Sequence, residues 1–168
     1  MKVHDIMIRN VKSCGPETNL AAATEMMWRN NCGALPVLDS ESNVIGVLTD
    51  RDMCIALGTR NQKASELKVA DVAVKPAFTC GPEDDVHQAL KTMRQHQVRR
   101  IPVVADDSKL AGILCLDEIV LQAVKSEHKI NGGISYEDVV NTMKAIYEHR
   151  AAKSPKAEAV AVGAASGH

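Results

Sequence analysis

An internal duplication constrains the fold of this chain more than any other feature of the sequence. When the sequence is shifted by 66 positions, residues 3–53 align with residues 69–119 without a gap, and 13 of the 51 aligned pairs are identical. Only about one pair in fifteen is expected to match between unrelated chains of ordinary composition. The chain therefore contains two copies of one structural unit, which we expect to be related by pseudo-twofold symmetry. The longest shared stretches are Cys14-Gly15-Pro16-Glu17 with Cys80-Gly81-Pro82-Glu83, and Pro36-Val37 with Pro102-Val103.

Each copy has the hydrophobic pattern of a β-α-β-β-α unit. A short extended piece and a Gly-Pro turn lead into a helix, with Asn19 placed to cap it in copy one and Asp85 in copy two. Two short apolar runs then indicate buried strands around a polar turn, and a second helix closes the copy. We therefore expect the α/β (α+β) fold class. The expected strands and closing helices are Ala34–Leu38, Val44–Thr49 and 50–57 in copy one, and 101–104, Leu110–Cys115 and 117–124 in copy two.

The same pattern divides the chain into five segments. Repeat 1 is expected at 1–60, a polar linker at 61–68, repeat 2 at 69–125, a C-terminal helical extension at 126–150 and a disordered tail at 151–168. Neither repeat alone has much core, so we expect the two to pack face to face, with a homodimer burying the apolar helix surface that remains. Ser135 and Asp138 fit a capping box at the start of the added helix. Its expected apolar face comprises Val139, Val140, Met143, Ile146 and Tyr147.

Composition narrows the classes of function. The formal net charge is −1 and aromatic residues make up 2% of the chain, so neither nucleic acid nor an anionic membrane is an expected partner. No apolar run is long enough to span a bilayer and the N-terminus lacks the apolar region of a secretion signal, which favours a cytoplasmic location. Five cysteines form no Cys-x-x-Cys pair and six histidines show no ligand spacing, so no metal site is expected.

The junction between the second strand and the second helix of copy one carries the clearest functional signal. Thr49 ends the strand, and Asp52 falls in the first helical turn. Backbone N–H groups and the positive end of the helix dipole favour a phosphate at such a junction, where Thr49 adds a hydroxyl donor. The Asp52 carboxylate can accept both hydrogen bonds of a ribose diol. The alternative is structural: Thr49 is then only an N-cap, and Asp52 only a favourable charge in the first turn.

Further motifs surround this junction and recur in the second copy. They are Asp5-Ile6-Met7, Gly33-Ala34-Leu35-Pro36-Val37 and Gly46-Val47-Leu48-Thr49-Asp50-Arg51-Asp52 in copy one, with Gln97-Val98-Arg99-Arg100-Ile101-Pro102-Val103 and Gly112-Ile113-Leu114 in copy two. On the basis of these motifs, residues 1–125 resemble the cystathionine β-synthase-type (CBS) domain pair, also called a Bateman module. The chain looks most like the stand-alone bacterial proteins of that family. The resemblance implies a cleft between the repeats that binds an adenosine-containing ligand: AMP, ADP, ATP, NAD or S-adenosylmethionine.

The family's binding residues can be carried over position by position. The resemblance places Thr49 and Asp52 at the head of one nucleotide site, where the opposing copy would contribute Phe78, Thr79, Val98 and Arg99. Copy two departs from the motif, because Cys115 and Glu118 stand where copy one has Thr49 and Asp52. A thiol is a weak donor and Glu is one methylene longer, so we expect the first site to be preferred. The degenerate second site comprises Cys115, Glu118, Lys12, Gly33 and Arg100.

Two functions from different classes remain. The leading hypothesis is a non-enzymatic sensor, in which a bound ligand biases the angle between the repeats and an unidentified partner protein reads the change. Catalysis is not expected because the chain has no Gly-x-Ser-x-Gly, Walker or Gly-x-Gly-x-x-Gly motif. The alternative is a thiol-based redox or protein-interaction protein with degenerate nucleotide clefts, in which Cys14 and Cys80 approach each other across the pseudo-twofold axis.

Overall fold

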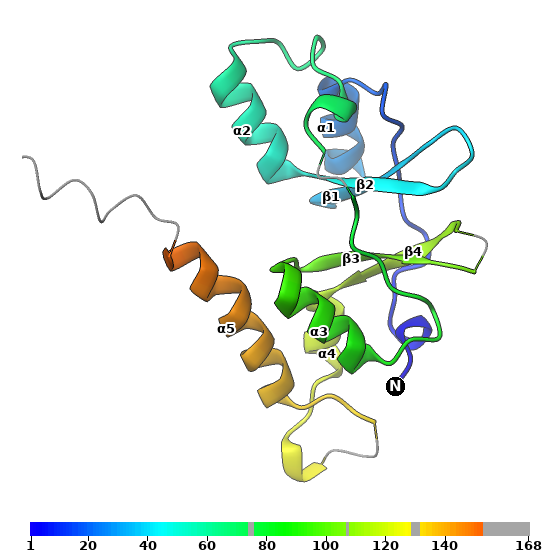
Figure 1. Cartoon of the computed structure of the whole chain (residues 1–168), viewed down its shortest axis with the longest axis vertical. Coiled ribbons are helices and arrows are strands. Elements are labelled where there is room, and N and C mark those ends of the chain that lie inside the picture. The colour runs from blue at the N-terminus through cyan, green and yellow to red at the C-terminus, as the bar shows by residue number, and fades with distance from the viewer. Residues whose placement is uncertain (74–75, 107, 129–131, 153–168) are drawn as a thin grey trace, which may run out of the picture.

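Two antiparallel β-hairpins, one from each copy, form the centre of the molecule (Figure 1). The computed structural model describes residues 1–73, 76–106, 108–128 and 132–152. Strands β1 and β2 pair in copy one, and β3 and β4 pair in copy two. Helices α1 and α2 lie beyond the first hairpin, and α3 and α4 lie beyond the second. The bounds are Leu20–Arg29 (α1), Ala34–Leu38 (β1), Val44–Thr49 (β2), Asp50–Arg60 (α2), Val86–His96 (α3), Arg100–Val104 (β3), Leu110–Cys115 (β4) and Leu116–Gln122 (α4).

The two copies match in detail, which confirms the fold class predicted from the repeat. Ala34 pairs with Thr49 at the end of the first hairpin, as Arg100 pairs with Cys115 in the second. Each register is interrupted by an irregularity at the equivalent place, before Leu38 and before Val104. The predicted helix caps are present as well: the side chains of Asn19 and Asp85 accept hydrogen bonds from backbone N–H groups in the first turns of α1 and α3.

The segment that begins each repeat crosses to the other repeat. The 3-10 turn Val3–Asp5 docks on copy two, where the N–H of Val3 donates to the carbonyl of Asp84 at 3.0 Å. Its counterpart Val69–Asp71 docks on copy one, where the N–H of Val69 donates to the carbonyl of Thr18 at 2.8 Å. Because both side chains are fully buried in the repeat they visit, neither copy completes its core without the other.

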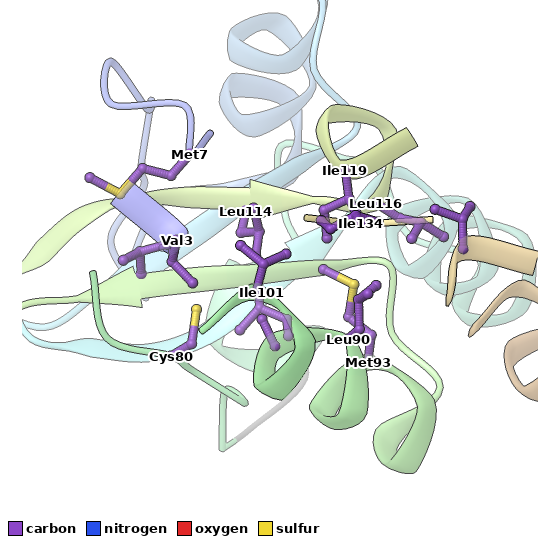
Figure 2. Packing of buried hydrophobic residues seen from close by; sticks show 14 of the residues in the cluster. Val3, Met7, Cys80, Leu90, Met93, Ile101, Leu114, Leu116, Ile119 and Ile134 are labelled. Atoms are coloured by element: carbon purple, nitrogen blue, oxygen red, sulfur yellow. The ribbon is translucent and has the colours of Figure 1, made fainter. Parts of the chain in front are cut away.

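Two aliphatic cores result, one beneath each hairpin. Figure 2 shows the larger, in which Val3 and Met7 from the N-terminus pack with residues of α3, β3, β4 and α4. Its fully buried members are Val3, Val86, Leu90, Met93, Ile101, Val103, Leu114, Ile119 and Ile134. The smaller core has Leu20, Ala23, Leu35, Val37, Leu48 and Val69 fully buried. Burial of this aliphatic surface is the main favourable term in folding a chain so poor in aromatic residues.

Two helix ends differ from the sequence-based expectation. Helix α2 continues through Gly58 to Arg60, because the left-handed residue that ends it is Asn61, with φ of 49°. Helix α4 ends at Gln122, because Val124 pairs instead with Ser135 beside the start of the next helix. That pairing is a long-range contact, so no local pattern indicates it.

The added helix α5, Tyr136–Ala152, packs on α3 and α4 (Figure 1). The predicted capping box is confirmed: the hydroxyl of Ser135 donates to Asp138 at 2.8 Å, and the N–H of Asp138 donates back at 3.2 Å. The predicted apolar face is only partly right. Val139 and Ile146 are buried and Met143 is half-buried, but Val140 and Tyr147 are 49% and 42% exposed.

A polar residue explains the rotation of the α5 face. Thr142 is fully buried and accepts a hydrogen bond of 3.0 Å from the guanidinium of Arg94 on α3. With Thr142 on the buried face, Val140 and Tyr147 point outward, an outcome that hydrophobicity alone does not predict. Of the tail predicted to be disordered, residues 153–168 lie outside the described residues, and the predicted limits of the repeats and the linker stay predictions. Within the part of the chain described, no helix is both long and apolar enough to cross a membrane.

We predict that Gly112→Ala destabilises the protein and Gly58→Ala does not. A Cβ on Gly112 would lie 2.6 Å from the carbonyl oxygen of Ile8, which accepts the N–H of Ile113 and holds the exchanged N-terminus. Overpacking there should lower the free energy of unfolding by about 2 kcal/mol. Gly58 sits in α2 with no atom within 4 Å of an added Cβ, so alanine should raise stability by up to about 1 kcal/mol. Urea denaturation measures both; equal stability of the two variants would contradict the prediction.

Candidate functional site

A cavity of about 300 Å³ lies between the two copies and is lined by both of them. From copy two it takes residues at the junction of β4 and α4, among them Cys115 and Glu118. Copy one contributes Lys12, which lies in the segment before α1, and Gly33, which lies just before β1. Arg100, the first residue of β3, lies between them. The structure thus brings together all five residues that the sequence assigned to a degenerate second site.

The wall of this cavity combines cations, carboxylates and apolar side chains. Lys12 and Arg100 supply positive charge, while Asp117 and Glu118 supply carboxylates. Asparagine amides and aliphatic groups complete the surface. The remaining lining residues are Ile8, Asn10, Val11, Asn30, Asn31, Cys32, Ala34 and Ile113. A concave, mainly pre-formed site with a few convergent polar groups is the usual form of a small-molecule pocket.

Gly33 keeps this cleft open. A Cβ at this position would lie 2.9 Å from Oδ2 of Asp50 and 3.4 Å from Nη2 of Arg100. Any larger residue would therefore push into both side chains, and through Arg100 into the cavity. A second, more open hollow of about 390 Å³ on the other side of Gly33 is lined by Asp50, Arg100 and Trp28, among others.

The equivalent cleft on the Thr49 side is much smaller, about 80 Å³. It is lined by Val47, Thr49, Pro76, Ala77, Phe78, Val98 and Arg100. Of the six residues predicted for the preferred site, the structure brings together Thr49, Phe78 and Val98 there. Asp52 is absent from the lining, and the side chains of Thr79 and Arg99 are exposed to solvent. The sequence favours the Thr49 site, but the larger cavity is the one beside Cys115 and Glu118. The assignment of these residues to a ligand stays a prediction.

Thr49 and Asp52 satisfy each other instead of facing an open cleft. The Thr49 hydroxyl donates to Oδ2 of Asp52 at 2.5 Å, and the N–H of Asp52 donates to Oγ1 of Thr49 at 3.2 Å. The N–H of Thr49 also donates to the Asp52 carboxylate at 3.2 Å. This is a complete capping box for α2, the structural alternative that the sequence left open. Copy two has no such arrangement, since Cys115 makes no side-chain cap hydrogen bond at the start of α4.

Phe78 is held by an aromatic partner that sequence reasoning missed. Its ring stacks on His96, the last residue of α3, with 3.6 Å between the ring centroids and 14° between the planes. Phe78 also lines the small cleft, so the stack fixes one side chain of its wall. No repeat signal indicates the contact, because the residues equivalent to Phe78 and His96 in copy one are Lys12 and Asn30.

The cysteines do not form a switch in this structure. Cys14 and Cys80 are buried in different hydrophobic cores. Each forms a β-bridge within its own copy of the repeat, Cys14 with Val37 and Cys80 with Val103. Burial raises the pKa of Cys14 to about 11, and burial together with the nearby Asp84 carboxylate raises that of Cys80 to about 12. Burial also raises the pKa of Cys115 to about 11, although the Arg100 guanidinium partly opposes the shift. Protonated, buried thiols are poor nucleophiles, which removes support from the redox alternative.

We predict that a maleimide at pH 8 modifies Cys54 rapidly and leaves Cys14, Cys80 and Cys115 intact. Cys54 is exposed on α2, whereas a thiol with a pKa of about 11 is ionised to only about one part in a thousand at pH 8. Intact-mass and peptide mass spectrometry over time would count the labels. Unfolding in guanidinium is the control, since all five cysteines should then react. Rapid labelling of Cys14 or Cys80 in the folded protein would restore the redox alternative.

Comparison with known proteins gives one consistent result. The CBS domain model matches residues 3–59 and again residues 69–125. The CBS domain-containing protein YhcV of Bacillus subtilis is 32% identical over 126 residues, which cover 74% of this chain and 87% of YhcV. A conserved CBS domain protein of unknown function from Thermoplasma acidophilum superposes with a TM-score of 0.72 at 25% identity, over 89% of this chain and 76% of that one. CBSX2 in complex with AMP gives a TM-score of 0.62 at 27% identity, over 71% and 93% of the two chains.

The family matches fall on the two repeats and the superpositions extend across both hairpins, so sequence and structure agree. The reciprocal docking of the opening segments and the cavity between the hairpins follow from the pairing of two such units. This chain belongs to the CBS domain family and contains two CBS domains in tandem.

Proposed function

We propose that this protein is a regulatory sensor that binds a phosphate-bearing adenosyl ligand between its two CBS domains. The observation that carries the proposal is the cavity of about 300 Å³ lined by both domains, with two cations and two carboxylates on its wall. Pockets that hold small molecules begin at about this volume. A ligand seated there contacts both domains at once and so can report on their relative position.

The groups on the wall suit the parts of a nucleotide. The guanidinium of Arg100 and the ammonium of Lys12 are placed for a phosphate, which a planar guanidinium grips with two parallel hydrogen bonds. The carboxylate of Glu118, half-buried at the start of α4, is the counterpart of the ribose-binding Asp expected from the family. Ile8 and Ile113 offer an apolar surface for the base.

AMP is the first candidate among the adenosyl ligands. CBSX2, which shares 27% of its residues with this chain over the aligned region, has been solved in complex with AMP. Arg100 and Lys12 can each pair with a phosphate of AMP, ADP, ATP or NAD, a contact that S-adenosylmethionine, which has no phosphate, would leave unmade. We place the main site on the Cys115 side, because the Thr49 cleft must open before it can admit a nucleotide.

Binding would act on a conformational balance. The domains share two exchanged segments, and the hairpins also meet where Lys109 donates to Asn43 at 3.1 Å. A ligand between them can shift their relative angle only by as much as its affinity differs between the two states. We propose that a cytoplasmic partner protein reads this change. Homodimerisation through the exposed apolar helix residues Trp28, Ile55 and Leu121 is part of the same proposal.

We predict that AMP binds saturably and that Glu118→Ala weakens binding by about tenfold, which corresponds to about 1.4 kcal/mol. The substitution removes a half-buried carboxylate from the cavity wall without touching a hydrophobic core. Calorimetric titration with AMP, ATP, NAD and S-adenosylmethionine would rank the ligands. Glu127→Ala is the matched control, because this glutamate is exposed in a 3-10 turn away from the cavity and should leave affinity unchanged. If none of the four ligands binds saturably, the proposed function is overturned.

We also predict that incubation with ATP and Mg²⁺ releases no phosphate above the buffer rate. The cavity wall carries two thiols, those of Cys32 and Cys115, and burial raises the pKa of Cys115 to about 11. The described residues of the wall include no serine, threonine or histidine, so they offer the ligand no hydroxyl nucleophile and no imidazole base. A malachite green assay at several enzyme concentrations measures the release. Phosphate production proportional to protein concentration, and lost in Glu118→Ala, would contradict the non-enzymatic proposal.

A further inference from the structure

An open hollow of about 390 Å³ adjoins the nucleotide cavity on the far side of Gly33. It lies against α1 and α2 of the first domain, which contribute Trp28 and Asp50 to its wall. Because Gly33 has no side chain, nothing extends from this position into the boundary between the two spaces. The cavity and the hollow meet there and share four lining residues: Asn31, Cys32, Gly33 and Arg100.

The Arg100 guanidinium stands at that boundary. Its Nη2 atom lies 3.4 Å from the point where a Cβ on Gly33 would stand, and Oδ2 of Asp50 lies 2.9 Å from the same point. On the cavity side, burial raises the pKa of the Cys115 thiol, and the nearby guanidinium opposes that rise. A phosphate held by Arg100 and Lys12 thus lies where the cavity meets the hollow. A group bonded to that phosphate continues past Gly33.

The equivalent groove of the second domain is covered by α5, which packs on α3 and α4 (Figure 1). Leu90 and Leu116 are buried in the core that α5 joins there (Figure 2). Their equivalents in copy one are Thr24 and Asp50, and both of these polar residues line the hollow. Leucine side chains suit a groove that receives an apolar helix, whereas a hydroxyl and a carboxylate suit a small polar ligand.

The hollow also offers an aromatic surface. Trp28 on α1 is 85% exposed, and it lines the hollow together with the buried side chains of Met27 and Met53. An exposed indole is a face on which a heterocyclic base can stack. The Asp50 carboxylate is a hydrogen-bond acceptor for the hydroxyls of a ribose. The wall therefore contains partners for both parts of a nucleoside.

We propose that the ligand is a dinucleotide, with its AMP half in the cavity and its second nucleoside in the hollow against Trp28. The inference rests on the proposed function and narrows its ligand class. The two phosphates that join the halves lie at Arg100, where the spaces meet. NAD, which is AMP joined through a second phosphate to nicotinamide riboside, is the probe. Its oxidised nicotinamide ring is cationic, and the face of a tryptophan attracts a cation.

Calorimetric titration of matched variants separates the two halves of the ligand. In the native protein we expect NAD to bind about tenfold more tightly than AMP, because stacking on Trp28 adds to the same cavity contacts. Trp28→Ala should reduce the NAD affinity to that of AMP and leave the AMP affinity unchanged. Trp28→Phe keeps an aromatic face and should retain most of the NAD affinity. Glu118→Ala should weaken AMP and NAD by the same factor, since both place their AMP half beside this carboxylate.

Fluorescence reports on the hollow directly, because Trp28 is the only tryptophan of the chain. NAD should quench its emission saturably, whereas AMP should leave the emission unchanged. Excitation at the red edge of the indole band avoids absorption by the nucleotides. Tyr136→Ala is the matched control, because this aromatic residue is 56% exposed on α5 and lines neither space. The control should leave both affinities and the quenching unchanged.

A second copy of the chain is the rival occupant, since Trp28 also belongs to the surface proposed for homodimerisation. Sedimentation velocity with and without NAD records the oligomeric state under the conditions of the titration. The nucleoside and the second copy compete for the same indole, so NAD should shift a dimer toward the monomer. A dimer in which NAD neither quenches Trp28 nor separates the copies would assign the hollow to the interface and overturn the inference.

The remaining outcomes distinguish the inference from the proposed function. Equal affinity for AMP and NAD in the native protein, or an NAD affinity that survives Trp28→Ala, would place the second nucleoside outside the hollow. Either result overturns the inference and leaves the proposed function in place. Undiminished Trp28 emission at saturating NAD has the same meaning. If neither AMP nor NAD binds, the proposed function itself fails, and the inference fails with it.

Discussion

The reciprocal exchange of the two opening segments is the constraint on which the rest of this structure depends. Val3 fills the core of the second domain and Val69 fills that of the first, each held by backbone hydrogen bonds to its host. A small domain buries too little surface to be stable alone, so each CBS unit completes its core with a 3-10 turn of the other. The exchange sets how the two hairpins face each other, and thereby the position and shape of the clefts between them.

Within that frame, a few substitutions between the copies produce unequal clefts. In the first domain, the Thr49 and Asp52 side chains bind each other, and Phe78 of the second domain, which lines the same cleft as Thr49, stacks on His96. In the second domain, the Cys115 side chain makes no cap hydrogen bond to α4, and Cys115 lines the open cavity. The cleft beside Thr49 measures about 80 Å³, and the cavity beside Cys115 and Glu118 about 300 Å³. Thr49, whose motif is the closer of the two to the family pattern, therefore lines the smaller cleft.

Much of this protein could be predicted from the repeat and from hydrophobic periodicity. Strands β1, β2 and β4 and the caps Asn19 and Asp85 occur where the sequence places them, because each depends on residues close in the chain. The five residues predicted for the second site do meet in one cavity. The rotation of α5 was not predictable, because it depends on the buried Thr142, whose hydrogen-bond partner Arg94 lies 48 residues away on α3. His96 was missed for the same reason, since its stacking partner lies on a different element.

The sequence by itself determined the duplication, the element order, the CBS family and the set of residues from which a cleft could be built. Those features follow from local patterning and from identity at one fixed offset, which need no knowledge of distance. Only the tertiary structure decided which domain each opening segment joins, which cleft is open and which arginine faces it. Arg99 and Arg100 are adjacent in sequence, but Arg99 lies in the bend before β3 and is exposed, whereas Arg100 begins the strand and lines the cavity between the domains. That choice depends on the register of β3 against β4 and on how the two hairpins face each other, and both are long-range contacts.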